Sequence, residues 1–249
     1  MVPIKSEKEI EIMAEGGEIL AKVMSELAGQ VRPGVKTIEL DRLAESLIFS
    51  FRAECSFKGY QGYPSCLCVS VNEEIVHAIP SERELKEGDI VSLDLGVKWK
   101  GFHADMAITL PVGQISLEAE KLIKATRGAL EKGVQELKPG SFLGNAEEAV
   151  QKCVESQRFN VIRDLCGHGI GRELHEEPQI LNYGKRGTGL KLKEGMVLCL
   201  EPMVAMGDWH LKKSPDGFGY LTKDGSLSAH FEQTIAITKN GAKSLTVIQ

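Results

Sequence analysis

The sequence predicts an α+β fold in which two related halves share a curved antiparallel sheet with helices on one face. The first observation is a repeat: segment 85–94 (LKEGDIVSLD) returns 107 positions later as segment 192–201 (LKEGMVLCLE). The second is Arg-Pro-Gly at 32–34, which returns 106 positions later as Lys-Pro-Gly at 138–140. Two repeats in nearly one register indicate a duplication inside a single domain. The two halves are about residues 1–113 and 114–249.

The first half reads as two helices followed by strands. Ser6 and Glu9 form a capping-box pattern, and an apolar stripe then predicts a helix that ends near Gly29. Thr37 begins a second helical pattern that continues to Phe51. The strands are expected at 67–71, 75–79, 90–96 and 101–110, with a turn at 97–100 that makes the last two a hairpin.

The second half repeats this order. A helix is expected at Leu117–Leu137, and Asn145 with Glu148 predicts a capped helix start before Val154. Strands are expected at 160–162, 196–201, 220–222, 229–238 and 244–248. Helices before strands in both halves are what the duplication predicts.

Composition narrows the class of protein. The chain has 249 residues, 42% of them apolar and 26% charged, which is ordinary for a globular protein. A net charge of −5 gives no reason to expect nucleic acid or an anionic membrane as a partner. No apolar run resembles a signal peptide or a membrane span. The six cysteines form no regular pattern, so we expect reduced thiols and a cytoplasmic protein.

Four acids lie in or beside the apolar strands. Asp94 and Asp105 occupy the two arms of the predicted hairpin, where a turn near Trp99 would pair them across the strands on one face. Glu201 ends the repeated segment, and the proline after it should end the strand. Glu232 shares its strand face with His230 and Thr234 by alternation. Surface acids are the ordinary alternative for each one, whereas a buried acid is costly unless a cation or hydrogen bonds compensate it.

Three histidines are further candidates. His168 lies between glycines in 166–171 (CGHGIG), which we expect to be a loop with room for a ligand beside the imidazole. His175 follows seven positions later, too far for the i, i+4 pair of a zinc-binding helix. His77 precedes the first repeated segment. For each of them, a structural role is the alternative.

The combined set is rich in oxygen and poor in thiolate. Four carboxylates with one or two imidazoles favour two divalent ions such as Mn²⁺, Fe²⁺, Co²⁺ or Zn²⁺ over one structural zinc. Two ions that share carboxylates activate water and polarise a carbonyl, which is the chemistry of hydrolysis. Glu201 is suited both to bind an ion and to carry the proton.

With these residues identified, the whole chain resembles the type I methionine aminopeptidases, the short bacterial form of a pita-bread metallopeptidase family. The motifs are the 94/105 spacing, Gly167–Gly171, Glu201-Pro202-Met203 and Ser228–Glu232. The resemblance implies helices on the outer face of the fold. It implies metal ligands at Asp94, Asp105, His168, Glu201 and Glu232, with Asp105 and Glu232 bridging the two ions. Asp94 would hold the first ion, and His168 and Glu201 the second.

The same resemblance implies how substrate binds. His77 and His175 match catalytic histidines that contact substrate and bind no metal, and Glu201 matches the general acid and base. A methionine pocket would include Tyr60, Tyr63, Cys68 and Phe218. Five residues differ from those frequent in the family and bear on pocket shape and metal preference: Gln61, Gln233, Phe218, Leu174 and Met106.

The resemblance therefore implies removal of the initiator methionine from nascent chains whose second residue is small. Two divalent ions would be needed, from among Co²⁺, Mn²⁺, Fe²⁺, Zn²⁺ and Ni²⁺. The expected partners are the N-termini of nascent polypeptides, with the ribosome exit as one place of action, and a monomer is expected. Only 25 residues separate His175 from Glu201, which leaves no room for the type II insertion, and no zinc-binding extension is expected before the first helix.

Two other functions compete with this interpretation. One is another pita-bread peptidase of the Xaa-Pro type, which carries a substantial domain ahead of the catalytic one. The other is a non-catalytic binding protein of the same fold, whose mark would be a missing metal ligand. Release of free methionine from Met-Ala-Ser with added metal separates the binding protein from the enzyme.

Overall fold

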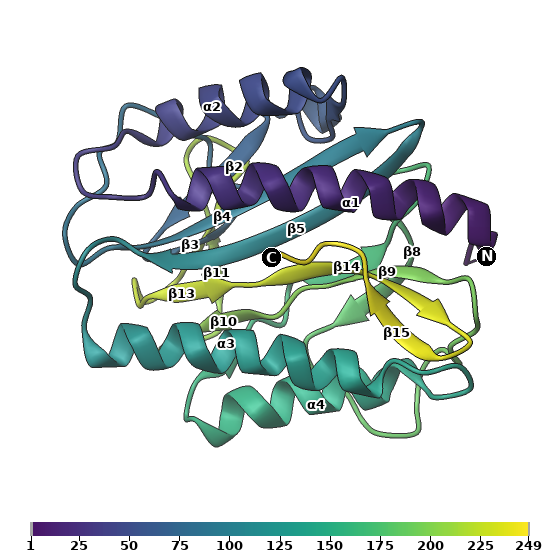
Figure 1. Ribbon diagram of the computed structural model, residues 1–249. Coiled ribbons are helices and arrows are strands. Elements are labelled where there is room, and N and C mark those ends of the chain that lie inside the picture. The colour runs from purple at the N-terminus through teal and green to yellow at the C-terminus, as the bar shows by residue number, and fades with distance from the viewer. Residues whose placement is uncertain (1, 249) are drawn as a thin grey trace.

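The computed structural model describes residues 2–248 as a curled sheet with helices on one side, which confirms the predicted fold class (Figure 1). The helices are α1 (Glu7–Ala28), α2 (Thr37–Ser50), α3 (Leu117–Glu136), α4 (Leu143–Ser156) and the 3₁₀ turn η1 (Tyr60–Gly62). The strands are β1 (Glu54–Cys55), β2 (Leu67–Val71), β3 (Glu74–Val76), β4 (Ile90–Trp99), β5 (Phe102–Pro111), β6 (Asn160–Val161), β7 (Cys166–Gly169), β8 (Glu176–Leu181), β9 (Val197–Leu200), β10 (Met203–Ala205), β11 (Leu211–Lys213), β12 (Tyr220–Thr222), β13 (Ser228–His230), β14 (Glu232–Thr238) and β15 (Gly241–Ser244).

The main sheet joins strands from both ends of the sequence. Its order is β1-β4-β5-β14-β9-β7-β8, with β2 paired to β4 and β15 paired to β14, and the pairs are antiparallel. The contact between the early hairpin and the later strands is made by β5 and β14. Strands that carry candidate acids in the sequence therefore become neighbours in the sheet.

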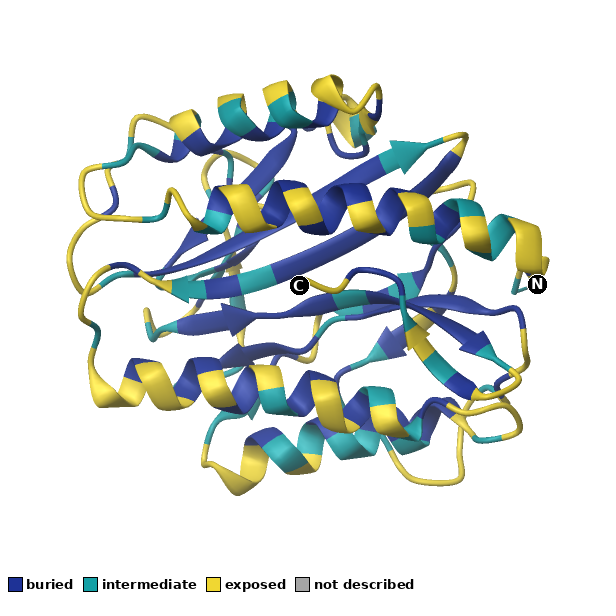
Figure 2. Cartoon of the chain, in the orientation of Figure 1, coloured by how far each residue is buried: buried dark blue, intermediate teal, exposed yellow. Residues whose placement is uncertain are grey.

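The helices cover one face of this sheet, and the burial of its strands is visible in Figure 2. Leu93 and Leu95 of β4 pack with α1 and α2, while Leu198 and Leu200 of β9 pack with α3 and α4. Because side chains alternate along a strand, Asp94 points to the face away from the helices. The helices thus stabilise the sheet from one side and leave the other side for chemistry.

The predicted capping box is present at the start of α1. The Ser6 hydroxyl accepts a hydrogen bond from the Glu9 N–H at 3.4 Å, and the Glu9 carboxylate accepts from the Ser6 N–H at 2.9 Å. The cap predicted at Asn145 is wrong, because α4 begins at Leu143 and is preceded by Phe142. The side-chain oxygen of Asn145 instead accepts a hydrogen bond of 2.8 Å from the N–H of Gly187, 42 positions later in the chain, so it does not cap the helix.

The predicted hairpin is present with a different turn. Trp99 pairs with Phe102, so the connection is Lys100-Gly101, both with positive φ, which matches the right-handed twist of a two-residue hairpin. Asp94 therefore pairs with Ala107, and Asp105 pairs with Gly96. The prediction that Asp94 and Asp105 are direct cross-strand partners is wrong, although they lie diagonally on one face.

Other boundaries also differ from the predictions. The expected strand at 229–238 is interrupted at Phe231 and divides into β13 and β14, and the last strand is Gly241–Ser244 rather than 244–248. Strand β9 ends at Leu200, one residue before Glu201. In residues 2–248 no helix combines the length and apolar character needed to cross a bilayer.

Two cysteines are not free thiols as predicted. Cys55 and Cys66 form a disulfide, with Cα atoms 5.3 Å apart. The reason is sheet pairing: β1 places Cys55 opposite Val97, and β2 begins at Leu67 opposite Leu95 on the same side of β4. Cys68, Cys153, Cys166 and Cys199 are free.

Candidate active site

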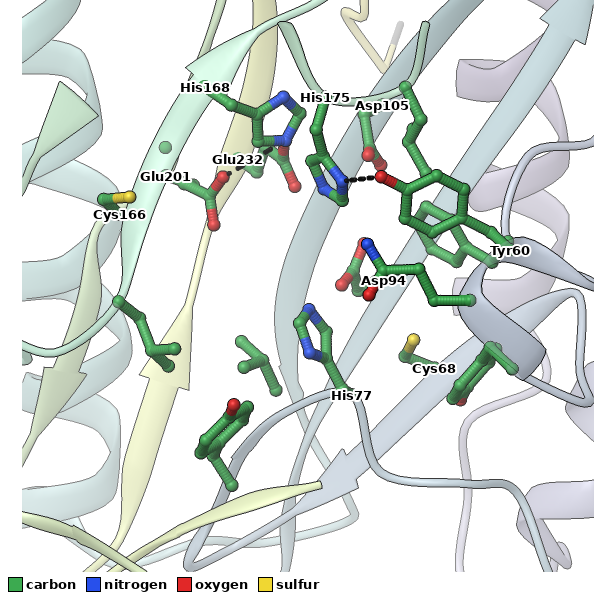
Figure 3. Close-up of a pocket in the computed structure, with 18 of the residues that line it drawn as sticks. Tyr60, Cys68, His77, Asp94, Asp105, Cys166, His168, His175, Glu201 and Glu232 are labelled. Atoms are coloured by element: carbon green, nitrogen blue, oxygen red, sulfur yellow. Dashed lines mark hydrogen bonds and ion pairs between the residues drawn. The ribbon is translucent and has the colours of Figure 1, made fainter. Parts of the chain in front are cut away.

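A cavity of about 740 Å³ lies on the face of the sheet away from the helices (Figure 3). Every residue proposed for the site from the sequence lines this cavity. Neighbouring strands β4, β5 and β14 supply Asp94, Asp105 and Glu232, while His168 comes from β7. Glu201 follows the end of β9. The remaining members of the set are His77, His175, Tyr60, Tyr63, Cys68 and Phe218.

Sheet register explains why the acids meet. Ala107 of β5 pairs with Asp94 on one side and with Glu232 on the other, so the three side chains point to one face. The small methyl group of Ala107 leaves space between the two carboxylates. Asp105 lies two residues away on β5 and therefore shares this face.

Asp94, Asp105 and Glu232 form a buried acid group. Each offers a carboxylate oxygen, and these atoms lie within 4.8 Å of one another. One oxygen of each carboxylate is buried with no hydrogen-bond partner. Burial raises the pKa of Asp94 to about 6, and burial with repulsion from neighbouring acids raises the pKa values of Asp105 and Glu232 well above the ordinary range. Unpaired buried carboxylates fit a cation.

Glu201 lies beside this group and faces an imidazole. His168 Nε2 is 3.5 Å from Glu201 Oε1 and 4.0 Å from Glu232 Oε1. The other ring nitrogen of His168 lies 2.9 Å from the Gly169 carbonyl, which orients the ring so that Nε2 faces the acids. Burial, followed by repulsion from Asp94, raises the pKa of Glu201 well above its usual value.

The glycines around His168 serve close strand packing rather than a loop, so the loop prediction is wrong. His168 is in β7 and pairs with Cys199 of β9. A Cβ atom at Gly167 would collide with the Cys199 carbonyl, and one at Gly169 would collide with the Glu177 carbonyl. These close approaches hold β7 against both of its neighbours and fix where the imidazole projects.

His77 and His175 point into the cavity from opposite sides (Figure 3). The Tyr60 hydroxyl lies 2.8 Å from His175 Nδ1, and the His168 and His175 ring centroids are 4.3 Å apart. His77 has a positive φ of 59°, a strained backbone for a residue with a side chain. Both residues keep an exposed part, and desolvation of the imidazole by the cavity walls lowers the pKa of His77 to about 4 and also lowers that of His175.

An apolar wall lies beside the acids. The rings of Tyr63 and Phe218 meet edge to face with centroids 5.5 Å apart, and Cys68 packs in the same apolar cluster. The Tyr63 hydroxyl lies within hydrogen-bond distance of two backbone carbonyls, that of Leu67 at 3.2 Å and that of Ala78 at 3.0 Å. Because its proton is directed to these carbonyls, the ring rather than the hydroxyl can contact a ligand. Burial raises the pKa of the Cys68 thiol, which keeps it neutral.

The five departures from the family pattern fall in two places. Gln61, Phe218 and Leu174 line the cavity. Met106 and Gln233 pair with each other on β5 and β14, and Met106 packs beneath the first two helices. Because alternate residues point to opposite faces, these two side chains face away from the acids, so they contact neither a bound ion nor its ligands directly.

One residue near the acids was not selected from the sequence. His230 Nε2 is 3.7 Å from Glu201 Oε2 and 4.0 Å from Glu232 Oε2. The available signal was the alternation that placed His230 on the face of Glu232. Alternation by itself was insufficient, because the strand is interrupted at Phe231 and only the tertiary structure shows which groups the imidazole lies beside.

Comparisons with known proteins agree with this geometry. Residues 11–239 match the family model described as metallopeptidase family M24. A methionine aminopeptidase of Bacillus subtilis is 48% identical over 246 residues, covering 99% of each chain. The crystal structure of a methionine aminopeptidase from Thermotoga maritima superposes with a TM-score of 0.97 at 46% identity, covering 99% of each chain.

A prolidase structure from Pyrococcus horikoshii represents the other peptidases with this fold. It superposes with a TM-score of 0.77 at 26% identity, over 99% of this chain but only 64% of the prolidase. Both the identity and the coverage are lower than for the aminopeptidases, so the comparison favours the aminopeptidase interpretation over the Xaa-Pro alternative.

Proposed function

Since this chain belongs to the metallopeptidase family M24 and, within it, to the methionine aminopeptidases, we propose that it hydrolyses the peptide bond after an N-terminal methionine when the second residue is small. One observation carries the proposal: unpartnered buried carboxylates and an apolar wall lie in one cavity. The acids provide a place for reaction, and the wall provides a place for the methionine side chain.

The donor set fits two divalent ions. Asp94 would hold the first ion, Asp105 and Glu232 would contact both, and His168 with Glu201 would hold the second. Buried oxygens without partners on Asp94, Asp105 and Glu232 support this assignment, because each would otherwise be a costly unsatisfied acceptor. Ions bound here supply Lewis acidity that polarises a carbonyl and makes water more acidic.

The protein's own groups move the proton and orient the substrate. Glu201 would accept a proton from the attacking water and deliver it to the departing amine, and its position beside the acid group allows both transfers. His175, oriented by the Tyr60 hydroxyl, and His77 on the other side would contact the peptide at the scissile bond. Their lowered pKa values keep both imidazoles neutral near pH 7, so each can donate one hydrogen bond.

The shape of the cavity supports the proposed selectivity. The methionine side chain would lie against Tyr63, Cys68 and Phe218, where apolar contact and the polarisable thioether favour binding. His175 and Tyr60 stand together across the cavity from His77, and a large second residue would have to displace them. The hydrogen bond of 2.8 Å between His175 Nδ1 and the Tyr60 hydroxyl holds the two side chains in place against such displacement.

The cellular setting follows from the proposed substrate. We propose the N-termini of newly made polypeptides as partners, with action near the ribosome exit, in the cytoplasm and as a monomer. The identity of the two ions belongs to the same proposal, with Co²⁺, Mn²⁺, Fe²⁺, Zn²⁺ and Ni²⁺ as the ions to compare.

The test is peptide hydrolysis by metal-free protein to which each ion is added in turn. We expect methionine release from Met-Ala-Ser, much slower release from Met-Lys-Ser, and cleavage of Leu-Ala-Ser slowed by about 10–200-fold. Equal rates for Met-Ala-Ser and Met-Lys-Ser would overturn the selectivity. Preferred cleavage before proline would identify an Xaa-Pro peptidase, and no release with any ion would identify a binding protein.

A further inference from the structure

His230 is a buried imidazole without a hydrogen-bond partner. Its side chain is enclosed, with the residue 1% exposed, and neither Nδ1 nor Nε2 has a partner among the described residues. An imidazole always carries at least one N–H donor, so leaving both nitrogens unsatisfied in the interior is costly. The acids of the proposed metal centre are the polar groups it faces.

His230 stands toward those acids as His168 does. His168 Nε2 is 3.5 and 4.0 Å from the Oε1 atoms of Glu201 and Glu232, and His230 Nε2 is 3.7 and 4.0 Å from their Oε2 atoms. These separations exceed a hydrogen bond. Ligand atoms about 2.1 Å from one ion lie about 3.0–3.4 Å apart, so a small inward movement makes either imidazole a ligand.

The backbone holds His230 in this place. The Thr109 hydroxyl is 2.8 Å from both the N–H and the carbonyl of His230, and the Ser92 hydroxyl lies 2.8 Å from Thr109 Oγ1. On its other side, β13 pairs His230 with Met203 of β10. A buried hydroxyl pair therefore fixes the direction of an imidazole that has no structural partner of its own.

We propose that His230 is a further ligand of the second ion, beside Glu201 and Glu232. Potential ligand atoms of these three residues lie within 4.8 Å of one another. The inference rests on the proposed metal-dependent function. It adds a second imidazole to an ion that would otherwise have only His168 as a nitrogen ligand. Imidazole suits Fe²⁺, Co²⁺, Ni²⁺ and Zn²⁺ better than Mn²⁺, so His230 favours those ions at the second position.

X-ray absorption of the unmodified protein loaded with two Co²⁺ ions is the direct test. The fine structure should contain scattering from two imidazole rings per two ions, where the set proposed without His230 predicts one. Because no substitution is made, misfolding cannot affect this measurement. Only one imidazole in the fully loaded protein would overturn the proposal.

A substitution gives an independent measurement. Calorimetry and visible absorption would follow a titration with Co²⁺. In His230→Gln the ion at the Asp94 position should bind normally, and the ion at the His168 and Glu201 position should bind about 100-fold or more weakly, since even outer-shell changes weaken metal binding by about 10–100-fold. The same substitution should weaken Mn²⁺ binding less. His168→Gln is the positive reference, and His210→Gln, at an exposed histidine beside Asp208, is the matched control.

The outcomes separate this inference from the proposed function. If the unmodified protein fails to bind two ions, the proposed centre is wrong. If it binds two ions and His230→Gln leaves the second affinity and the Co²⁺ spectrum unchanged, the centre stands and His230 is not a ligand. A weaker second ion with an unchanged spectrum would also overturn the assignment, because it would make His230 a positioning residue.

Discussion

Thr234 and Asp105 are joined by a double hydrogen bond between β14 and β5, the strands that carry Glu232 and Asp105. The Thr234 hydroxyl donates to the Asp105 carbonyl at 2.8 Å and accepts from the Asp105 N–H at 2.9 Å. This bridge links β5 to β14 two residues from Glu232. It stabilises the backbone beside Asp105 and Glu232, the two carboxylates proposed to contact both ions.

The first prediction tests this bridge. Thr234→Val keeps the shape of the side chain but leaves two buried backbone groups of Asp105 unpaired, so the free energy of unfolding should fall by about 1–3 kcal/mol. Urea unfolding of the metal-free protein measures it. Thr234→Ser keeps the hydroxyl and is the control. A Thr234→Val variant as stable as the wild type would show that these hydrogen bonds do not contribute to stability, and a loss in Thr234→Ser alone would assign the effect to the methyl group.

The second prediction concerns Glu201. Glu201→Gln should lower kcat by about 10²–10⁴-fold, because an amide cannot accept the proton of the attacking water. Circular dichroism should show an intact fold, since the amide has nearly the shape of the acid. The assay is methionine release from Met-Ala-Ser. A variant that kept more than about a tenth of the wild-type rate would remove Glu201 from the proton-transfer role.

The third prediction separates substrate contacts from metal ligands. His77→Ala and His175→Ala should each lower turnover while both ions remain bound, because neither imidazole belongs to a potential ligand group among residues 2–248. Metal content measured beside kinetics decides the matter. Tyr60→Phe should have a smaller effect in the direction of His175→Ala, since it removes only the hydroxyl that orients this imidazole. Loss of an ion from either alanine variant would make that histidine a ligand.

The fourth prediction concerns metal-free protein at different pH values. Asp105, Glu201 and Glu232 have pKa values raised well above those of the unfolded chain, so the folded state binds extra protons and loses stability as they dissociate. The free energy of unfolding should therefore fall as the pH rises through neutrality toward these raised pKa values. The histidines with lowered pKa values change the free energy of unfolding mainly at lower pH, because within this window they are largely neutral in both the folded and the unfolded state.

Unfolding by urea at fixed pH values, with a chelator present, measures that slope. Added Co²⁺ or Mn²⁺ should stabilise the protein most at the alkaline end, because bound cations favour the ionised acids. A Glu232→Gln variant should show a smaller slope without metal. A free energy of unfolding that rises with pH in this window would mean that the acid group is already neutralised by other means.

The sequence by itself determined the fold class and most of each helix, and it selected residues that the structure gathers around one cavity. Local chemistry was enough for α1, because Ser6 and Glu9 cap it within one turn. Alternation was enough to place the candidate acids on one strand face. The repeated segments and the motifs around His168 and Glu232 were enough to indicate the family, which the comparisons then showed.

Only the tertiary structure decided how those residues meet. Asp94 and Glu232 share a row through Ala107 because β5 lies between their strands, a register set by pairing over more than 120 positions of sequence. Pairing with β9 made β7 a strand, and pairing of β1 and β2 with β4 brought Cys55 to Cys66. His230 is the clearest case, because its proposed role as a ligand depends on its distances to Glu201 and Glu232 on other segments. Local sequence fixes which way a side chain points along its own strand, whereas long-range packing fixes what it points at.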